Sequence, residues 1–258
     1  MDINKEIPPK LSCVLIVKNE AHNIARCLNA LGWANEIIVL DTGSTDNTAE
    51  LCKNLGAKLF YLDNWEGFGK AKQAAVELAQ YPWVLSIDAD EVVSPELQQA
   101  IQTTINKADS YVGYRIKRST WFITRWIKHC GWDKDYPLRL FRKDSGAFTP
   151  DLVHESIKVS GRVGILQEPL LHYSYPSLEQ HQTRLIFYGR LWAEEQQRKG
   201  KQSSISSAIF HSIWKFISMY FWQKGWLDGK AGLLLSISSA FSVYYKHVRL
   251  WELQQKSR

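Results

Sequence analysis

The sequence lacks the features that mark a secreted or disulfide-rich protein. Its first ten residues, MDINKEIPPK, are polar, so the apolar region of a signal peptide is missing. No CxxC pair occurs, and the cysteines stand far apart in the chain, at Cys13, Cys27, Cys52 and Cys130. We therefore expect buried free thiols and a reducing, cytoplasmic setting.

A long apolar run and a glycine-rich loop are missing as well. The uncharged stretch Ala231–Tyr245 has fifteen residues, four of them serine, whereas a membrane-spanning helix needs about 20 apolar residues. No glycine-rich phosphate loop follows the apolar run Leu11–Val17. These two absences disfavour a bilayer-spanning segment and a nucleotidyltransferase, respectively.

Apolar periodicity predicts alternating strands and helices in the first hundred residues. Apolar runs that indicate buried strands occupy Leu11–Val17, Glu36–Asp41, Lys58–Leu62 and Trp83–Asp88. Helical spacing is found over 20–33, 46–55 and 69–80, and Ser94 before Pro95 marks a capped helix start. Such alternation builds an open, largely parallel sheet with helices on both sides.

The pattern changes after Tyr111. Strands without intervening helices are expected at Val112–Ser119, Pro137–Arg142, Val153–Val159 and Leu170–Tyr173, as a mixed continuation of the sheet. From Ser177 onward the pattern is helical, with breaks near Gly200 and at Gly225–Gly229. We predict an α/β domain over residues 1–176 and a helical extension over residues 177–258.

Acidic side chains follow two of the predicted strands. Asp41 ends the second strand, and Asp88, Asp90 and Glu91 follow the fourth. Because ligands of parallel α/β sheets bind beyond the carboxyl ends of the strands, these acids indicate a site. Clustered acids repel unless a cation or hydrogen-bond donors compensate them, and Asp-Ala-Asp spacing suits one hard cation with phosphate oxygens as further ligands. Helix capping is the alternative, above all for Asp41 before TGSTD.

Several segments of the sequence resemble those of a known family. The segments LSCVLIVKNEAHNI, EIIVLDTGSTDNT and VLSIDADE are similar, in order and spacing, to family 2 glycosyltransferases of the GT-A fold. Further segments resemble the bacterial lipopolysaccharide inner-core β-1,4-glucosyltransferases: WDKDYPLRLFRK, FTPDLVHESI, LLHYSY and the tail WKFISMYFWQKGWLDGKAGLLLSISSAF. The resemblance covers nearly the whole chain. It implies a GT-A-type open mixed sheet flanked by helices, with a helical C-terminal extension.

The resemblance also implies a donor site. Asp41 would hydrogen-bond the uracil or ribose, and Asp88 would contact the ribose or sugar. Asp90 would hold Mg²⁺ or Mn²⁺ against the diphosphate, and His172 is a candidate third protein ligand, with a structural role as the alternative. The further donor-binding residues are Val17, Lys18, Glu20, Ala89 and Lys72, the last of which is otherwise a solvated helix lysine.

An inverting transfer needs a base for the acceptor hydroxyl. Relatives carry an acid in the region of VHESI, so Glu155 is the expected base. The alternatives are His154, which faces the other way on a regular strand, and the acids Asp133, Asp135 and Asp151. Acceptor or diphosphate contacts are expected from Trp132, Arg139 and His154, and Arg142 is a further candidate; exposed strand arginines are the alternative.

The C-terminal region carries the positive charge. The net charge is +6, yet from Gln180 onward twelve Lys/Arg stand against four Asp/Glu, which leaves −2 for the first 179 residues. The segment Ile205–Trp222 mixes aromatic residues with lysine, as do helices that lie in the headgroup region of a membrane. We expect peripheral association with the inner face of the inner membrane; a helical hairpin packed on the first domain or on a second subunit is the alternative.

The resemblance implies a metal-dependent inverting hexosyltransferase that moves glucose from UDP-glucose onto a lipopolysaccharide inner-core heptose. Another donor or acceptor, such as a different envelope glycan or a polyprenyl phosphate, stays open. A nucleotidyltransferase and a non-catalytic binding protein are the alternatives of other classes. Nucleic acid is not an expected partner, because the acid cluster would repel a polyanion.

Overall fold

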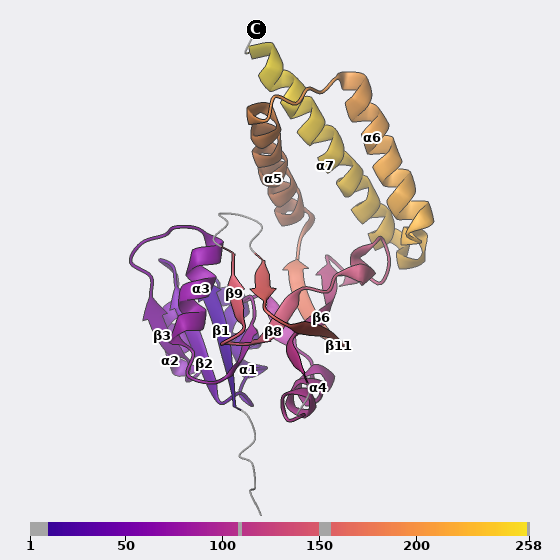
Figure 1. Ribbon diagram of the computed structural model, residues 1–258. Helices are drawn as coiled ribbons and strands as arrows, with labels where there is room; N and C mark the ends of the chain where they lie inside the picture. Colours follow the sequence, from indigo (N-terminus) through magenta and orange to yellow (C-terminus); the bar gives the residue numbers. More distant parts are fainter. Residues whose placement is uncertain (1–9, 108–109, 150–155, 257–258) are drawn as a thin grey trace, which may run out of the picture. The chain divides into compact units, whose positions relative to one another are not determined.

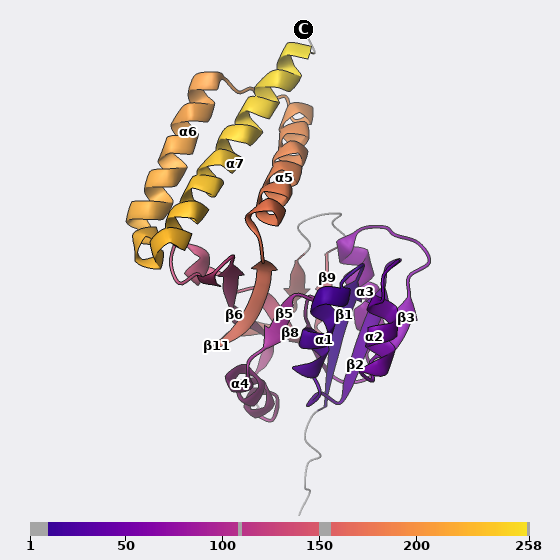
Figure 2. The ribbon, with the colours of Figure 1, turned by 180° about the vertical axis from the view of Figure 1, so that it is seen from behind.

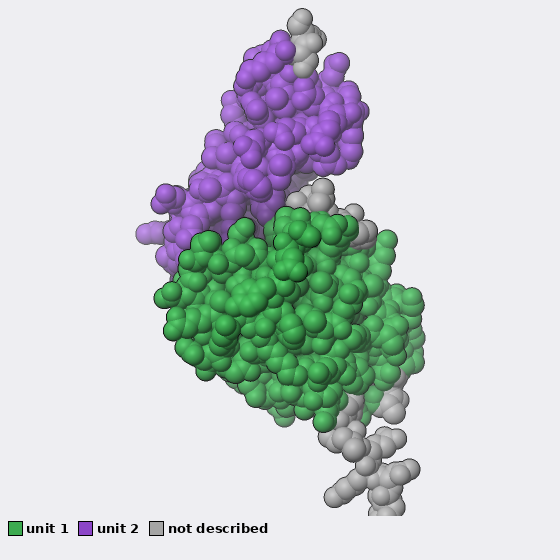
Figure 3. Space-filling view, turned by 90° about the vertical axis from the view of Figure 1, so that its left-hand side faces the viewer, with its two compact units in different colours: residues 1–118, 136–172 green, residues 119–135, 173–258 purple. Residues whose placement is uncertain are grey.

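A computed structural model describes residues 10–107, 110–149 and 156–256 (Figures 1 and 2). The chain divides into two compact units, coloured separately in Figure 3. The first, which we call the sheet unit, comprises residues 1–118 and 136–172. The second, the helical unit, comprises residues 119–135 and 173–258, so a short internal segment groups with the C-terminal region.

The N-terminal half of the sheet unit alternates strands and helices as predicted. Strands β1 (Leu11–Val17), β2 (Glu36–Asp41), β3 (Lys58–Tyr61) and β4 (Trp83–Ser86) run parallel, in the order β3-β2-β1-β4. The connecting helices are α1 (Ala21–Asn29), α2 (Thr48–Asn54) and α3 (Phe68–Leu78). The four strands and three helices predicted for this half are therefore confirmed, with boundary shifts of a few residues.

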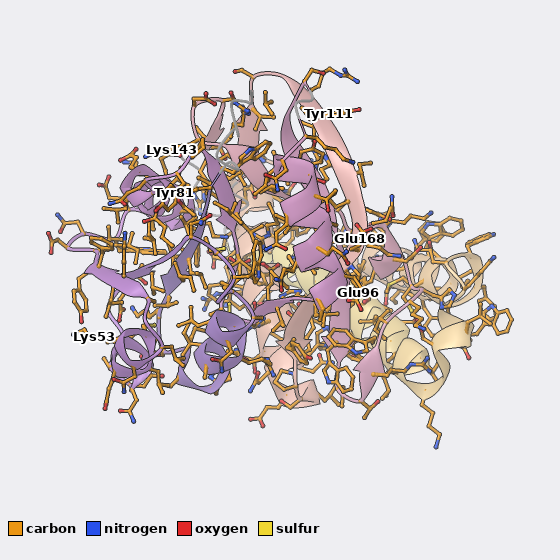
Figure 4. All side chains as sticks on the ribbon, turned by 90° about the horizontal axis from the view of Figure 1, so that it is seen from below. Lys53, Tyr81, Glu96, Tyr111, Lys143 and Glu168 are labelled. Atoms are coloured by element: carbon orange, nitrogen blue, oxygen red, sulfur yellow. The ribbon has the colours of Figure 1, made fainter. Side chains whose placement is uncertain are left out.

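Side-chain alternation along β1 builds one core on each face of the sheet. Leu11, Cys13 and Leu15 pack with α1, α2 and α4 (Pro95–Ile105), while Val14 packs with α3. Figures 1 and 2, which view opposite sides, show α3 on one face and α1 with α2 on the other. Figure 4 labels Glu96 on the first turn of α4, where the Ser94 Oγ caps the helix by accepting from the Leu97 N–H (3.1 Å). Burial on both faces explains the unbroken apolar runs of these strands.

Strands of mixed direction extend the sheet beyond β4, and the first of them, β8, runs antiparallel to it. The order continues β8-β6-β11-β5, with β7 on β6, while β9 and β10 form a separate pair. These strands are β5 (Glu91–Val93), β6 (Tyr111–Phe122), β7 (Arg125–Trp126), β8 (Leu138–Arg142), β9 (Gly146–Phe148), β10 (Ile157–Val159) and β11 (Arg162–Tyr175). The predicted mixed continuation is confirmed. Strand β11 is longer than the predicted Leu170–Tyr173. Its first part does not show in the sequence, because Gly164 and Pro169 interrupt the apolar alternation that marks a strand.

The helical unit is built on three long helices, α5 (Leu178–Arg198), α6 (Ile205–Ile217) and α7 (Gly229–Lys256), with α7 between the other two in both ribbon views. The turns η2 (Ser218–Trp222) and η3 (Gly225–Asp228) join α6 to α7, and η1 (Trp132–Lys134) lies in the internal segment. The predicted breaks near Gly200 and at Gly225–Gly229 are confirmed. None of the helices within residues 10–107, 110–149 and 156–256 is long and apolar enough to cross a membrane.

The internal segment 119–135 completes the core of the helical unit. Phe122, Ile127 and Cys130 pack there with Met219 and Leu235. The fully buried Asp228 carboxylate reinforces this packing by accepting backbone hydrogen bonds from Lys128 (3.2 Å) and His129 (2.8 Å). All four cysteines are buried and free, as predicted.

Candidate active site

The carboxyl ends of the parallel strands meet at one edge of the sheet, where Val17 of β1 lies opposite Asp41 of β2. Asp41 is 2% exposed, and its Oδ1 accepts hydrogen bonds from the backbone N–H groups of Gly43 (2.9 Å) and Ser44 (2.7 Å). The carboxylate therefore holds the turn after β2. It does not cap α2, whose N-cap residue is Asn47, so the capping alternative for Asp41 does not hold.

Hydrogen bonds join the loop after β1 to the loop after β2. Asn19, at φ 57°, donates its N–H to the Ser44 Oγ (3.0 Å) and accepts at Oδ1 from the Thr45 N–H (2.7 Å). The N–H of Glu20 donates to the Thr48 Oγ1 (2.8 Å). The adjacent Lys18 is exposed. The residues expected to bind the nucleotide thus lie at the ends of β1 and β2 and in the two loops that follow, which these hydrogen bonds join. We call the joined loops the rim.

A largely buried ion network lies beyond the end of β4. The Lys72 ammonium, from α3, is 2.9 Å from the Asp88 Oδ1, and the Arg139 guanidinium, from β8, contacts the Asp88 Oδ2. The same guanidinium is 2.7 Å from the Glu91 Oε1, and Arg118 of β6 is 3.3 Å from that oxygen. Lys72 is 8% exposed, so it is not a solvated helix lysine. Cations from three elements therefore compensate two acids.

This network fixes the charge of Asp88. Burial works to raise its pKa, but the Arg139 guanidinium and the Lys72 ammonium outweigh that effect and hold the pKa well below its usual range. For Arg139, burial works to lower the pKa, and the carboxylates of Asp88 and Glu91 reverse this and raise it. Asp88 is therefore an ionised acceptor of hydrogen bonds at neutral pH, suited to sugar or ribose hydroxyl groups.

Asp90 and His172 lie together although they are far apart in sequence. The His172 Nε2 is 3.2 Å from the Asp90 Oδ2, because β11 pairs antiparallel with β5 and places His172 opposite Glu91. The side chain of Ala89 is buried in the core, between the two aspartates of the motif. The fold thus brings both residues expected to bind metal to one point.

The Asp90–His172 pair offers two ligands to a divalent ion. Within the described parts of the chain, no group of three or more His, Cys, Asp or Glu residues is arranged to hold a metal. One carboxylate and one imidazole nevertheless fit an ion that completes its shell with diphosphate oxygens and water. The His172 Nδ1 is buried and has no hydrogen-bond partner among the described residues, so the ring is not committed to a second protein group. The residues present fit an open metal site.

A cavity of 330 Å³ opens beside Asp88, a volume at the lower end of the range for small-molecule sites, about 300–1,000 Å³. Its basic lining consists of Lys72, Arg115, Arg118 and Arg139. Besides Asp88, the remaining lining consists of one polar residue, Ser156, and the apolar residues Pro137, Leu138, Phe148 and Ile157. Arg115 and Arg118 were not among the expected site residues; they stand on β6, where a strand pattern alone does not separate site arginines from exposed ones.

Two further candidates, Trp132 and Arg142, have aromatic contacts of their own. Trp132 packs in the helical unit against Phe122 and Tyr175, with ring centroids 6.1 and 5.8 Å apart. Arg142 lies opposite Trp83, at the start of β4 and so at the far end from Asp88, and its guanidinium stacks 5.4 Å from the Trp83 ring centroid. The diphosphate contact suggested for Arg142 is therefore wrong.

Three of the base candidates, Glu155, His154 and Asp151, lie outside the described residues. The predicted strand Val153–Val159 is described only from residue 156, where β10 covers Ile157–Val159. The other candidates, Asp133 and Asp135, belong to the helical unit, in and directly after η1.

Comparison with known proteins decides the family. The model of Glycosyl transferase family 2 matches residues 12–157, more than half of the chain. The chain belongs to this family. The match starts in β1 and ends in β10, so it spans Asp41, the Asp88 network and the cavity.

Full-length relatives extend the similarity through the helical unit. This family 2 glycosyltransferase is 31% identical to a glycosyltransferase of Rickettsia conorii, over 99% of this chain and 95% of that one. It is 28% identical to the lipopolysaccharide core biosynthesis glycosyltransferase LpsC of Rhizobium meliloti, over 92% and 93% of the two chains. The resemblance to lipopolysaccharide core enzymes is thereby confirmed.

A solved structure also shows similarity. Glucosyl-3-phosphoglycerate synthase from Mycobacterium tuberculosis, in complex with Mn²⁺, uridine diphosphate and glucosyl-3-phosphoglycerate, is 22% identical and superposes with a TM-score of 0.39. The superposition covers 43% of this chain and 44% of the synthase. The assignment to family 2 rests on the sequence comparisons.

Proposed function

We propose that this glycosyltransferase moves a hexose, glucose from UDP-glucose, with inversion onto a hydroxyl of the lipopolysaccharide inner core, a heptose hydroxyl. The observation that carries the proposal is the arrangement at the strand ends, where the ionised Asp88 adjoins the Asp90–His172 pair and Asp41 lies on the same sheet edge. Similarity to LpsC over nearly the whole chain supports the acceptor class.

Each described residue has a defined task in this proposal. Asp41 and the rim bind the nucleoside, and Asp88 accepts hydrogen bonds from the sugar. Asp90 and His172 would hold Mg²⁺ or Mn²⁺, which as a Lewis acid would neutralise the leaving diphosphate. Lys72 and Arg139 keep Asp88 ionised and aimed.

Glu155 is proposed as the base that takes the proton of the acceptor hydroxyl. Its chain neighbours Ser156 and Ile157 line the cavity beside Asp88, which supports a place for this segment near the reacting groups. Glu155→Gln should abolish transfer and leave donor binding near normal, as measured by UDP-glucose titration. Normal turnover in this variant would reject the base assignment.

The reaction itself is tested by product release. Purified protein is incubated with UDP-glucose, other UDP-sugars and ADP-sugars, each with truncated core lipopolysaccharide, and with Mn²⁺, Mg²⁺ or chelator. We expect release of UDP and gain of one hexose on the acceptor, both lost with chelator. A nucleotidyltransferase would release pyrophosphate instead, and a binding protein would release nothing.

The metal ligands are tested separately from turnover. Asp90→Ala should remove the part of UDP affinity that depends on added Mn²⁺. The matched control is Asp144→Ala, which changes an aspartate in the turn between β8 and β9. Equal metal dependence in Asp90→Ala and wild type would reject the metal role.

We also propose that the helical unit binds the cytoplasmic face of the inner membrane. The η2–η3 turn exposes Phe221, Trp222, Trp226 and Leu227, and the adjacent Lys224 and Lys230 are exposed too. We call these six residues the aromatic tip. Aromatic and basic side chains together favour the headgroup region, and each basic residue near an anionic surface adds about 1 kcal/mol.

Vesicle flotation tests the aromatic tip. Wild-type protein should float with vesicles that contain anionic phosphatidylglycerol, and the double variant Trp222→Ser/Trp226→Ser should float much less. Trp65→Ser, which changes an exposed tryptophan of the sheet unit, is the control. If the double variant floats like wild type but loses a dimer seen by light scattering, the tip is a subunit contact instead.

A further inference from the structure

A group of basic side chains lies between the helices of the helical unit and has no part in the proposed reaction. It consists of His211 and Lys215 on α6 and of Lys246 and His247 on α7. The two residues of α6 are four positions apart, so they share one face of that helix. We call these four side chains the basic cluster.

His247 lies at the centre of the contacts. Its ring stacks on that of His211, with the centroids 4.9 Å and the planes 18° apart, and its centroid is 5.1 Å from that of Trp192 on α5. Its Nδ1 is 3.2 Å from the hydroxyl oxygen of Ser203, in the loop between α5 and α6. The Lys246 ammonium lies 4.5 Å from the Trp192 ring centroid. The cluster therefore joins side chains from all three long helices (Figure 1).

The members of the basic cluster are close enough to oppose one another's protonation. Burial lowers the pKa of Lys246, and the ammonium of Lys215 lowers it further. Burial also lowers the pKa of His247, with further contributions from His211 and Lys246. A positive neighbour disfavours the charged form of a basic group, whereas a negative neighbour favours it. An anion bound among the four groups would therefore reverse this effect.

No carboxylate forms an ion pair with the basic cluster among the residues that the structure describes. Glu252 of α7 pairs with Arg249 and Lys256, and the acids near the end of α5 pair with basic residues close to them in the chain. The two residues of the helical unit outside the description, 257 and 258, are serine and arginine. His211 is exposed and the other three members are half-buried, so the cluster is open to solvent.

The chemistry of these groups suits a phosphate group. Lysine ammonium and protonated imidazole donate hydrogen bonds, and phosphate oxygens accept several of them at once. The Ser203 hydroxyl, beside His247, adds a further donor. A bound anion would also relieve the repulsion between Lys215 and Lys246.

We propose that the basic cluster binds a phosphate group, either of a free phosphate ester or of the headgroup of an anionic lipid. The site goes beyond the proposed sugar transfer, because it belongs to the helical unit and uses none of the residues assigned to donor, metal or base. It recognises its ligand through two ammonium groups and two imidazoles from α6 and α7.

Inorganic phosphate is the first probe, added to the full chain after saturation with UDP and Mg²⁺ has filled the diphosphate site. We expect calorimetry to show phosphate binding, and Lys215→Gln and Lys246→Gln each to weaken it about tenfold or more, as loss of a charged hydrogen bond does. Lys215→Arg should largely retain binding. The control is Lys199→Gln, which makes the same charge change at an exposed lysine that pairs with Glu195.

The histidines give the site a pH dependence that helix packing alone would not produce. Sulfate serves as the probe, because its charge is the same at pH 6 and at pH 8. A bound anion favours the protonated form of His247, whose pKa is lowered without it, so sulfate should bind about threefold more tightly at pH 6, or better. His247→Gln should remove most of this difference, and Lys199→Gln should keep it.

Three results would overturn the site. If phosphate does not bind to the UDP-saturated protein, the cluster serves only to pack the helices. If Lys199→Gln weakens phosphate binding as much as Lys215→Gln does, or if sulfate binds equally at pH 6 and pH 8, the anion binds elsewhere. Release of UDP from UDP-sugars is measured in parallel, so a failure of the proposed function is seen independently of a failure of this site.

Vesicle flotation distinguishes the two sources of phosphate. If the ligand is a lipid headgroup, Lys215→Gln/Lys246→Gln should float less than wild type with phosphatidylglycerol vesicles, and inorganic phosphate should compete. The control Lys199→Gln/Lys201→Gln removes the same charge from exposed lysines, and both double variants leave the aromatic tip intact. Equal flotation of the two double variants, or no flotation of wild type, assigns a free phosphate ester instead.

Discussion

Replacement of Arg139 by methionine tests whether the ion network stabilises the sheet unit. Arg139 is 6% exposed and bridges Asp88 to Glu91, whose side chain is fully buried. Methionine keeps much of the volume but removes the charge, so it leaves the Glu91 carboxylate without its closest cation. Breaking a buried ion pair in this way costs about 3–5 kcal/mol. For a protein of this size the melting temperature should fall by about 6 °C or more.

Thermal unfolding followed by circular dichroism measures the effect. Arg142→Gln is the control, because its arginine lies on the same strand, is exposed and only stacks on Trp83, so the loss should stay within about 1 kcal/mol. The double variant Glu91→Gln/Arg139→Met should recover at least about 1 kcal/mol, because no buried charge is then left without its partner. If Arg139→Met is no more destabilised than Arg142→Gln, the network does not stabilise the fold.

The same variant has a predicted pH dependence. The folded pKa of Asp88 is lowered, so its ionisation stabilises the protein fully above its unfolded pKa, about 3.9, and this contribution is lost as pH falls through the lower folded value. Without Arg139 the folded pKa moves upward. Acid unfolding should therefore begin at a higher pH in Arg139→Met than in wild type.

Burial, with Arg184 nearby, lowers the pKa of His181 in the folded protein to about 4. In the unfolded chain the pKa of this histidine is about 6.5, so the unfolded state binds more protons below that pH. The free energy of unfolding should therefore fall by about 2 kcal/mol from pH 7 to pH 5. His181→Gln should flatten this dependence in urea titrations at the two pH values. Gly232→Ala should cost about 3 kcal/mol or more, since its Cβ would lie 1.9 Å from a backbone carbonyl oxygen of the preceding turn, while Gly32→Ala, whose nearest atom is 3.9 Å away, should be nearly neutral by thermal shift. Ser94→Ala should remove the cap of α4 and lower the free energy of unfolding by about 1 kcal/mol, and an unchanged urea midpoint would contradict the capping role.

Local patterns predicted the first half of the fold well. The runs at β1, β2 and β4 are apolar because both sheet faces are covered, and Ser94-Pro95 starts a helix through chemistry confined to a few residues. Strand β11 escaped prediction beyond Leu170–Tyr173, because its place in the sheet depends on the distant strands β6 and β5 and not on its own alternation.

The site divides in the same way. The positions of Asp41, Asp88 and Asp90 at the ends of strands could be predicted, because each residue ends or closely follows an apolar run in the sequence. The bridge from Asp88 through Arg139 to Glu91 could not, since it spans about fifty residues and depends on β8 lying beside β4. Arg115 and Arg118 were missed for a related reason, because only the folded cavity distinguishes them from other arginines of the chain.

The grouping of residues 119–135 with the C-terminal helices limits which truncations and chimeras of the protein can fold. Phe122, Ile127 and Cys130 make up half of the buried cluster whose other members are Met219, Ala231 and Leu235. A truncation at residue 177 would strip the cover from this internal segment and would also remove Asp228, which holds the backbone at Lys128 and His129. The C-terminal region is therefore not an independent module that can be removed or exchanged between relatives. Chimeras that test acceptor choice should carry the internal segment and the helices over together.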